Sequence, residues 1–227
     1  MPTRHADWRE DAAVRRTMTA MTQVFKVHPV NPQRRLLERA AAVLKDGGVI
    51  VYPTDSTYAL GCQLANKEAL ERIRALRRVD ESHEFSLVCR DLSQIANYAK
   101  VDNRAYRLIR SLTPGPYTFI LKATHEAPRR LQDPKKRSVG IRVPANRIAA
   151  DLLDIVGEPI VSSTLQLPGD ELPLTDPEEF KDVIDKRVDV ILDGGACGVE
   201  PTTVLDLSGG DVRLVRQGKG DASAILS

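Results

Sequence analysis

The sequence predicts an α/β fold built on a mixed parallel and antiparallel sheet flanked by helices. Short apolar runs rich in β-branched residues alternate with amphipathic segments for most of the 227 residues, which is typical of strands separated by helices. The last two apolar runs are joined by a Ser-Gly-Gly-Asp turn that suits an antiparallel hairpin. The length is enough for one sizeable core, so we expect a single domain.

The first elements expected are a helix and a buried strand. Asn31 and Pro32 are suited to cap and open the helix, and Gly47 is suited to close it. Residues 49–52 follow a pair of glycines and are all β-branched or aromatic, so they are expected to form the strand, which Pro53 ends.

The later elements are predicted from the same signals, which are hydrophobic periodicity and the turn or cap residues at each end. Apolar residues at helical spacing predict helices, and short β-branched runs between turn residues predict strands. Asn146 is suited to cap one helix, and Asp176 with Pro177 to start another. These helices are expected at residues 67–78, 92–99, 103–112, 146–156 and from 176, and the strands at residues 85–89, 117–122, 138–143, 159–163, 188–192, 203–207 and 212–216.

The first 22 residues differ from the rest of the chain. They are polar and basic without a hydrophobic period, so we expect a disordered tail before a domain that spans residues 23–227. Met18 and Met21 lie just before the first patterned segment, so a misassigned upstream start is an alternative explanation of these residues. No apolar run approaches the roughly 20 residues of a membrane span, and the first residues lack the apolar centre of a signal peptide. We therefore expect a cytoplasmic protein with no membrane partner.

Cysteine and histidine give no sign of a metal site. Cys62, Cys89 and Cys197 are far apart and form no CxxC pair, so free and mostly buried thiols are expected. The four histidines are equally scattered, which argues against a metal site built on them.

Charge is segregated along the chain, although the formal net charge is only +2. Residues 104–147 hold eleven Lys or Arg against two acids, a balance of +9, and residues 170–193 hold nine acids against three Lys or Arg, a balance of −6. A basic segment in a near-neutral protein indicates a site for anions, either nucleotide phosphates or an RNA backbone. An ordinary solvated surface is the alternative.

Hydroxyl groups crowd the loop after the first predicted strand. Four hydroxyls and one carboxylate follow Pro53, on Thr54, Asp55, Ser56, Thr57 and Tyr58. An open α/β sheet usually holds its ligand at the carboxyl end of a strand, so this loop is a candidate binding site. A polar turn without a ligand is an equally good interpretation of the loop alone.

Four other segments bring polar groups to strand boundaries. Residues 113–118, TPGPYT, form a stiff turn that either holds backbone groups against a ligand or only leads into a strand. Arg142 lies in an apolar strand and needs an anionic partner, either a ligand or an internal acid. Hydroxyls cluster at residues 161–169 and 201–204, and Arg216 lies at a later strand end. The usual phosphate loops, GxxxxGK[ST] and GxGxxG, are absent from the sequence.

Taken in order, these segments resemble the YrdC/YciO family of threonylcarbamoyl-AMP synthases and their paralogues, over about residues 33–220. PTDSTYALG is similar to the family's PTETVYGLG loop, TPGPYTFIL to its PGPxTxIL turn, and GIRVP to its Arg-bearing strand. PTTVLDL and LVRQG are similar to its closing STVVDL and LRPG elements. The variants YALGC, FSLVCRDLS, VDN and APRRL are closest to the YciO branch. The resemblance implies the family's twisted, open sheet.

The resemblance also implies a nucleotidyltransferase of the L-threonylcarbamoyladenylate synthase type. L-Threonine and bicarbonate would give a carbamate that attacks the α-phosphate of ATP, which releases pyrophosphate and forms threonylcarbamoyl-AMP for tRNA modification. ATP would be a substrate, Mg²⁺ would arrive with the nucleotide, and no resident metal is implied. Such adenylyl transfer depends on positioning and on cations around phosphate charge.

Position by position, the resemblance implies two catalytic arginines, Arg77 and Arg142. Arg77 stands where the synthases have the Lys of a Lys-x-Arg pair, and Val79 stands where they have the Arg. Thr164 and Gln166 replace a Ser-x-Asn pair. The implied substrate-binding residues are Thr54 and Tyr58 for threonine, Ser56 for threonine or ATP, and Ser163, Thr164, Thr203 and Arg216 for the nucleotide.

These departures leave a second function open. Arg keeps the charge of Lys but not its compact ammonium, so the exchange at a phosphate site is not conservative. The alternative is a non-catalytic or weakly catalytic YciO-type protein that binds double-stranded RNA, tRNA or rRNA through a concave basic face.

Overall fold

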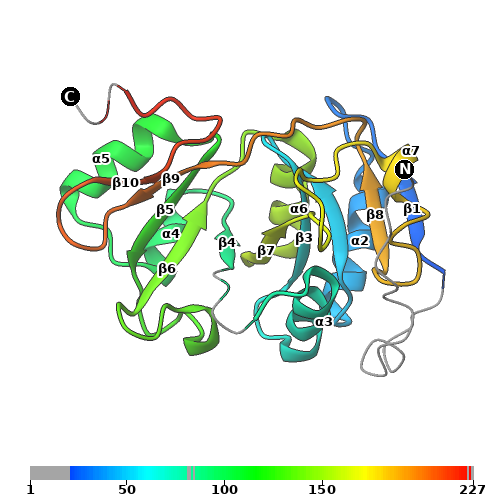
Figure 1. Cartoon of the computed structure of the whole chain (residues 1–227), viewed down its shortest axis with the longest axis horizontal. Coiled ribbons are helices and arrows are strands. Elements are labelled where there is room, and N and C mark those ends of the chain that lie inside the picture. The colour runs from blue at the N-terminus through cyan, green and yellow to red at the C-terminus, as the bar shows by residue number, and fades with distance from the viewer. Residues whose placement is uncertain (1–20, 81–82, 84, 224, 226–227) are drawn as a thin grey trace.

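One ten-stranded sheet runs through the protein, with the strand order β1-β8-β2-β3-β7-β4-β6-β5-β9-β10. The computed structural model describes residues 21–80, 83, 85–223 and 225 (Figure 1). Strand β8 pairs in parallel with β1 and β2, β4 with β6, and β5 with β9, whereas the other neighbours pair antiparallel. The expected mixed sheet is confirmed. The strands are β1 (Gln23–Lys26), β2 (Ile50–Pro53), β3 (Tyr58–Gln63), β4 (Ser86–Val88), β5 (Tyr117–Lys122), β6 (Ser138–Arg142), β7 (Ile160–Thr164), β8 (Val190–Asp193), β9 (Thr203–Asp206) and β10 (Arg213–Arg216).

Helices pack against this sheet through two buried clusters. The helices are α2 (Arg34–Lys45), α3 (Lys67–Arg77), α4 (Leu92–Tyr98), α5 (Asn103–Leu112), α6 (Arg147–Val156) and α7 (Pro177–Phe180), with a 3-10 turn η2 (Arg129–Leu131). Side chains alternate along β2, because successive residues of a strand point to opposite faces. Ile50 and Tyr52 join the cluster formed with α2 and α6, while Val51 joins the cluster that includes α3.

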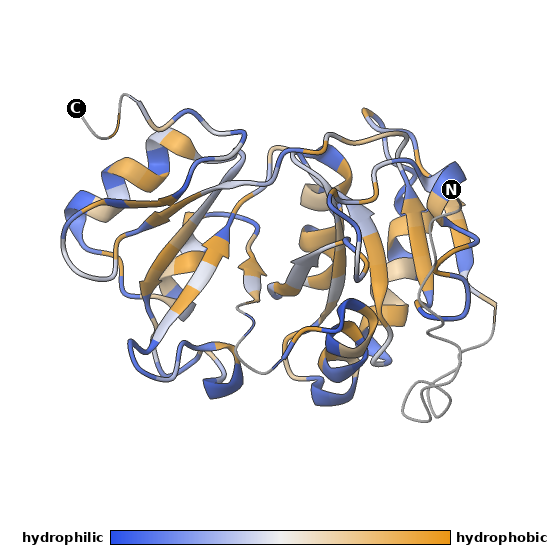
Figure 2. Cartoon of the chain, in the orientation of Figure 1, coloured by the Kyte–Doolittle hydropathy of each residue, from blue (hydrophilic) through white to orange (hydrophobic). Residues whose placement is uncertain are grey.

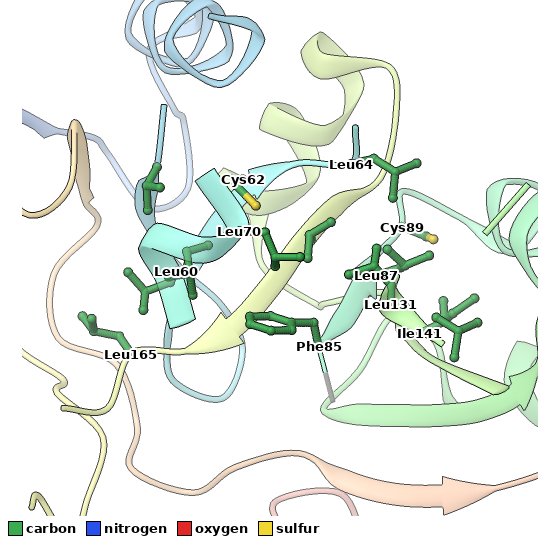
Figure 3. Packing of buried hydrophobic residues seen from close by; sticks show 14 of the residues in the cluster. Leu60, Cys62, Leu64, Leu70, Phe85, Leu87, Cys89, Leu131, Ile141 and Leu165 are labelled. Atoms are coloured by element: carbon green, nitrogen blue, oxygen red, sulfur yellow. The ribbon is translucent and has the colours of Figure 1, made fainter. Parts of the chain in front are cut away.

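Hydropathy follows this arrangement. Figure 2 shows strands that are largely hydrophobic and helices with one hydrophobic and one hydrophilic side, as amphipathic helices on a sheet require. The larger cluster draws side chains from distant parts of the chain, among them Leu60, Leu70, Phe85, Ile141 and Leu165 (Figure 3). Cys62 and Cys89 are buried free thiols and Cys197 is half-buried, as expected.

The predicted cap at Asn31 is wrong. Helix α2 begins at Arg34, two residues later than predicted, with Gln33 as its N-cap and no side-chain cap hydrogen bond. His28 explains the delay, because its Nδ1 accepts from the backbone N–H groups of Val30 and Asn31, at 3.2 and 3.1 Å. The Gln33 amide oxygen in turn accepts from the His28 N–H at 3.0 Å. This local hydrogen bonding holds the segment in a bend before the helix starts.

Two strands were not predicted. Strand β3 follows the hydroxyl loop directly and pairs antiparallel with β2, so the loop is the turn of a hairpin. Strand β1 pairs in parallel with β8 at the edge of the sheet. The predicted tail lies outside the described residues except for Met21 and Thr22, and the Thr22 hydroxyl donates to the Val188 carbonyl at 2.8 Å. Within the described ranges, no helix is long and apolar enough to cross a membrane.

Candidate functional site

A cleft with a volume of about 660 Å³ lies over strands β5, β6 and β7. Strand alternation gives it a partly polar wall. On β5, Thr118 and Ile120 line the cleft, while Phe119 and Leu121 point into the core. Strand β9 extends the wall, and the Thr118 hydroxyl lies 2.9 Å from the hydroxyl of Thr202, which directly precedes β9. Thr118 and Thr202 were not predicted as site residues.

The predicted residues divide into two groups. The cleft is lined by Arg77, Arg142, Ser163, Thr164 and Arg216. It is not lined by Thr54, Ser56, Tyr58 or Thr203. The structure therefore brings together three guanidinium groups from α3, β6 and β10, which are far apart in the sequence.

Arg77 lies at the C-terminal end of α3 and is held by two other cleft residues. Its Nη1 donates to the Ser163 hydroxyl and to His83 Nε2, the latter at 2.9 Å. His83 Nε2 also lies 3.0 Å from the Ser163 hydroxyl. Burial lowers the pKa of Arg77.

His83 is the residue of this group that the sequence analysis missed. A guanidinium can only donate, so the His83 Nε2 that faces Arg77 must be an acceptor, which places the proton of the neutral ring on Nδ1. Burial, with Arg77 and Arg74 adding to it, lowers the pKa of His83 to about 4. The ring is therefore neutral at physiological pH. No spacing motif in the sequence marks this histidine.

Arg142 forms an ion pair inside the protein. Its Nη2 lies 2.5 Å from Asp55 Oδ1, and the other Asp55 oxygen accepts from the Ala145 N–H at 2.9 Å. The Arg142 Nε is buried and has no hydrogen-bond partner among the described residues. Of the two partners that the sequence left open, the internal acid is present, and contact of Arg142 with a ligand stays a prediction.

The Thr54 hydroxyl shapes the hairpin turn. It donates to the Thr57 carbonyl at 2.6 Å and accepts from the N–H groups of Ser56 and Thr57, both at 3.2 Å. Thr54 and Ser56 are buried, and Thr57 is the residue of this turn that lines the cleft. The turn thus contributes Thr57 to the lining of the cleft, a different residue than predicted.

Tyr58 and Thr203 also use their hydroxyls within the protein. The Tyr58 hydroxyl donates to the Gly195 carbonyl at 2.7 Å and accepts from the Gly194 N–H at 3.1 Å, and burial raises its pKa. The Thr203 hydroxyl donates to the Gly220 carbonyl and accepts from the Gly218 N–H at 2.9 Å. Both hydroxyls are thus occupied by backbone groups of the protein.

Arg216 reaches the cleft from the edge of the sheet. Its Nη2 and Nε donate to the Thr202 carbonyl at 3.0 and 3.2 Å, and burial lowers its pKa. Glu171 is the carboxylate among the residues that line the cleft. Three guanidiniums, one carboxylate and several hydroxyls suit a ligand that carries more than one negative charge.

Comparison with known proteins supports one family. The Sua5/YciO/YrdC family model, described as "Telomere recombination", matches residues 42–218. The chain is 52% identical over 206 residues to a protein of Escherichia coli K12 named "Uncharacterized protein YciO", covering 91% of this chain and 100% of the relative. It is 31% identical to a threonylcarbamoyl-AMP synthase of Halorhodospira halophila, covering 75% of this chain and 89% of that enzyme.

Solved structures agree with this result. The crystal structure of E. coli YciO superimposes with a TM-score of 0.86 at 52% identity and covers 89% of this chain and 98% of that one. The P. abyssi Sua5 structure complexed with L-threonine gives a TM-score of 0.83 at 24% identity, over 90% of this chain and 60% of that one. At this lower identity, the likeness shows the fold.

Proposed function

Because the chain belongs to the Sua5/YciO/YrdC family, we propose that it forms threonylcarbamoyl-AMP and pyrophosphate from L-threonine, bicarbonate and ATP. Relatives at 31% and 32% identity carry the name threonylcarbamoyl-AMP synthase. The product would serve the modification of tRNA. The close YciO relative is named as uncharacterized, so the proposal rests on the site of this chain.

The observation that carries the proposal is the convergence of Arg77, Arg142 and Arg216 on one cleft. Adenylyl transfer places negative charge on the α-phosphate and on the leaving pyrophosphate, and preorganised cations and hydroxyl donors stabilise that charge. A cleft of about 660 Å³ is within the usual size range of ligand pockets.

The proposed reaction needs no covalent intermediate with the protein. An oxygen of the threonine carbamate attacks the α-phosphorus of ATP, the bond from the α-phosphorus to the bridging oxygen breaks, and pyrophosphate leaves with that oxygen. Arg77, held in position by Ser163 and His83, would face phosphate oxygens. Arg142 would bind a carboxylate or phosphate, and Thr57, Thr118 and Thr202 would supply hydroxyl donors or acceptors.

The proposed reaction takes its Mg²⁺ with the nucleotide. Within the described residues, no group of three His, Cys, Asp or Glu side chains is placed to hold one. Mg²⁺ is commonly bound by substrate phosphates with one or two carboxylates, and Glu171 lines the cleft. The ion would neutralise charge on the phosphates that it accompanies.

The test is threonine-dependent release of pyrophosphate. The purified protein is incubated with ATP, Mg²⁺, threonine and bicarbonate, and mass spectrometry detects the labile adenylate. Arg142→Ala is expected to lower the rate about 10²- to 10³-fold, the typical effect of removing one transition-state donor. Arg147→Ala is the matched control, because Arg147 is exposed on α6 and does not line the cleft.

Two outcomes would contradict the synthase proposal. One is the absence of threonine-dependent product with folded wild-type protein. The other is an equal loss of activity in both arginine variants, since only Arg142 belongs to the cleft.

One observation favours the second candidate function, RNA binding. Of the eleven cations in residues 104–147, all except Arg142 are exposed, so most of this charge is available at the surface. Such binding should weaken steeply with salt and should survive Thr54→Val, since phosphate contacts dominate it. Affinity for RNA that vanishes near physiological salt would contradict this function.

A further inference from the structure

A second cleft, with a volume of about 640 Å³, lies between α3 and the segment that joins β5 to β6. Lys67, Leu70, Glu71 and Arg74 line it from α3. The opposite wall is formed by residues 129–135, which include η2 and belong to the basic segment singled out in the sequence. His83 is the residue that lines both clefts, so the two lie side by side.

This second cleft is strongly basic. Its lining contains five cationic side chains, Lys67, Arg74, Arg129, Arg130 and Lys135, against the carboxylates of Glu71 and Asp133. The Asp133 carboxylate is already engaged, since its Oδ1 accepts from the backbone N–H groups of Lys135 and Lys136. These hydrogen bonds contribute to the lowered pKa of Asp133. The carboxylate therefore stays ionised, and five cations against two carboxylates leave the lining with a formal balance of +3.

Arg74 is the most informative residue of the second cleft. Its side chain is only 9% exposed, and its guanidinium lies over the Phe85 ring, 5.0 Å from the centroid. Nη1 donates to the Asp80 carbonyl, but the buried Nε has no hydrogen-bond partner among the described residues. The Glu71 carboxylate forms an ion pair with that Nε at 3.6 Å, a distance too long for a hydrogen bond. A buried donor without a partner is costly unless a ligand completes it.

We propose that the second cleft binds a phosphate-bearing anion and is a separate site from the main cleft. Cations from two independent segments face a common space, which suits a ligand with several negative oxygens. Leu70, Leu131 and Pro134 supply apolar surface beside them, so a ligand with both phosphate and apolar parts is accommodated. The chemistry fits free pyrophosphate and the backbone of a polynucleotide alike. The proposal does not depend on synthase activity.

The experiment uses the double variant Arg129→Glu/Lys135→Glu in the full chain. Both side chains are exposed, so their replacement is not expected to disturb the core. Pyrophosphate binding is measured by calorimetric titration, and binding of a labelled 16-base-pair RNA duplex by fluorescence anisotropy at several salt concentrations. The control is Arg35→Glu/Lys45→Glu on α2, which changes the net charge equally at exposed positions outside both clefts.

The double variant is expected to weaken binding of one probe by about tenfold or more, while the control remains within about twofold of wild type. If RNA is the ligand, the slope of log affinity against log salt should become shallower by about 0.9 for each phosphate that the variant no longer neutralises. Arg142→Ala is expected to leave this binding in place, because that residue belongs to the main cleft.

The probe whose binding is weakened in the Arg129→Glu/Lys135→Glu protein identifies the ligand as a small anion or as a nucleic acid. A pyrophosphate site that disappears only in the Arg129→Glu/Lys135→Glu protein indicates a small anion, and selective loss of duplex binding indicates a nucleic acid. Arg74→Lys, which keeps the charge but not the guanidinium, should also weaken the binding. The proposal is overturned if neither probe binds wild-type protein, or if both bind the double variant and the control equally well.

Discussion

At the scale of single residues, the contacts that a polar side chain makes within the protein decide whether it is available to a ligand in the cleft. Thr54 and Thr57 belong to the same turn, yet the Thr54 hydroxyl is used inside the turn and Thr57 faces the cleft. Residue type predicted a hydroxyl at this position, but the direction of each side chain depends on the hairpin that β2 and β3 form. Thr118 and Thr202 were missed for the same reason, because their proximity follows from the pairing of β5 with β9.

The arginines were easier to predict than the hydroxyls. A guanidinium inside an apolar strand needs a partner wherever the strand lies, so Arg142 could be recognised without knowledge of the fold. Its actual partner, Asp55, is 87 residues away and could not be assigned from the sequence. His83 could not be predicted either, because its state depends on Arg77 and Ser163, which only the folded chain brings next to it.

The neutral state of His83 predicts a specific dependence of stability on pH. The unfolded histidine has a pKa of 6.5 and the folded one about 4, so below pH 6.5 the unfolded chain binds a proton that the folded chain does not. The free energy of unfolding should therefore fall as the pH drops from 6.5 toward 4, and this contribution should be constant above that window. Urea unfolding of wild-type protein and His83→Asn at several pH values measures it.

In His83→Asn this contribution is absent, so the stability difference between the two proteins should narrow as the pH falls from 7 to 4. A difference that stays constant across this range would show that His83 is not held neutral. The comparison is needed because carboxylates throughout the protein also titrate at the lower end of the window.

At the scale of elements, prediction succeeded where capping or periodicity is local. The caps at Asn146 and Asp176 are present and each accepts a backbone N–H in the first turn of its helix. Local signals failed at Asn31, whose own backbone N–H donates to His28 Nδ1 in the bend that precedes the helix. Strand β3 was missed because residues 58–63 continue a hydroxyl-rich loop, and only pairing with β2 and β7 makes them a strand.

Helix α3 is a suitable element for a stability test because it supplies arginines to both clefts. The Asn66 side-chain oxygen accepts from the Ala69 N–H at 2.8 Å and caps the helix. Asn66→Ala is expected to lower the free energy of unfolding by about 1 kcal/mol, the usual effect of removing an N-cap. Asn66→Asp keeps the acceptor and should retain most of the stability in urea denaturation. A decrease of equal size in both variants would mean that another interaction of Asn66 matters more than the cap.

At the scale of the whole molecule, the sheet and the larger buried cluster are continuous. The cluster contains residues from Val49 to Leu205, and each strand hydrogen-bonds to its neighbours across all ten positions of the sheet. The sequence correctly predicted the mixed α/β class from alternating elements. It could not predict the strand order, because β8 lies between β1 and β2 although it comes from the last quarter of the chain.

A continuous core predicts that the domain unfolds as one cooperative unit. Differential scanning calorimetry should give a single transition whose calorimetric and van't Hoff enthalpies agree. Two separated transitions would contradict the single domain expected from the sequence, and would mean that the strands on either side of β4 and β7 melt independently.

The Asp55 ion pair would compete with any anion that binds Arg142 in the main cleft. The Asp55 carboxylate pairs with Arg142, and the Asp55 carbonyl accepts from the Lys219 ammonium. Asp55 therefore contacts two cationic side chains. A phosphate or carboxylate that approached the Arg142 Nη2 would weaken this ion pair, and that loss would offset part of the new attraction. The Asp55 carboxylate would form its ion pair with Arg142 again when such a ligand dissociates. On the proposed function, this competition would favour rapid release of a ligand from Arg142.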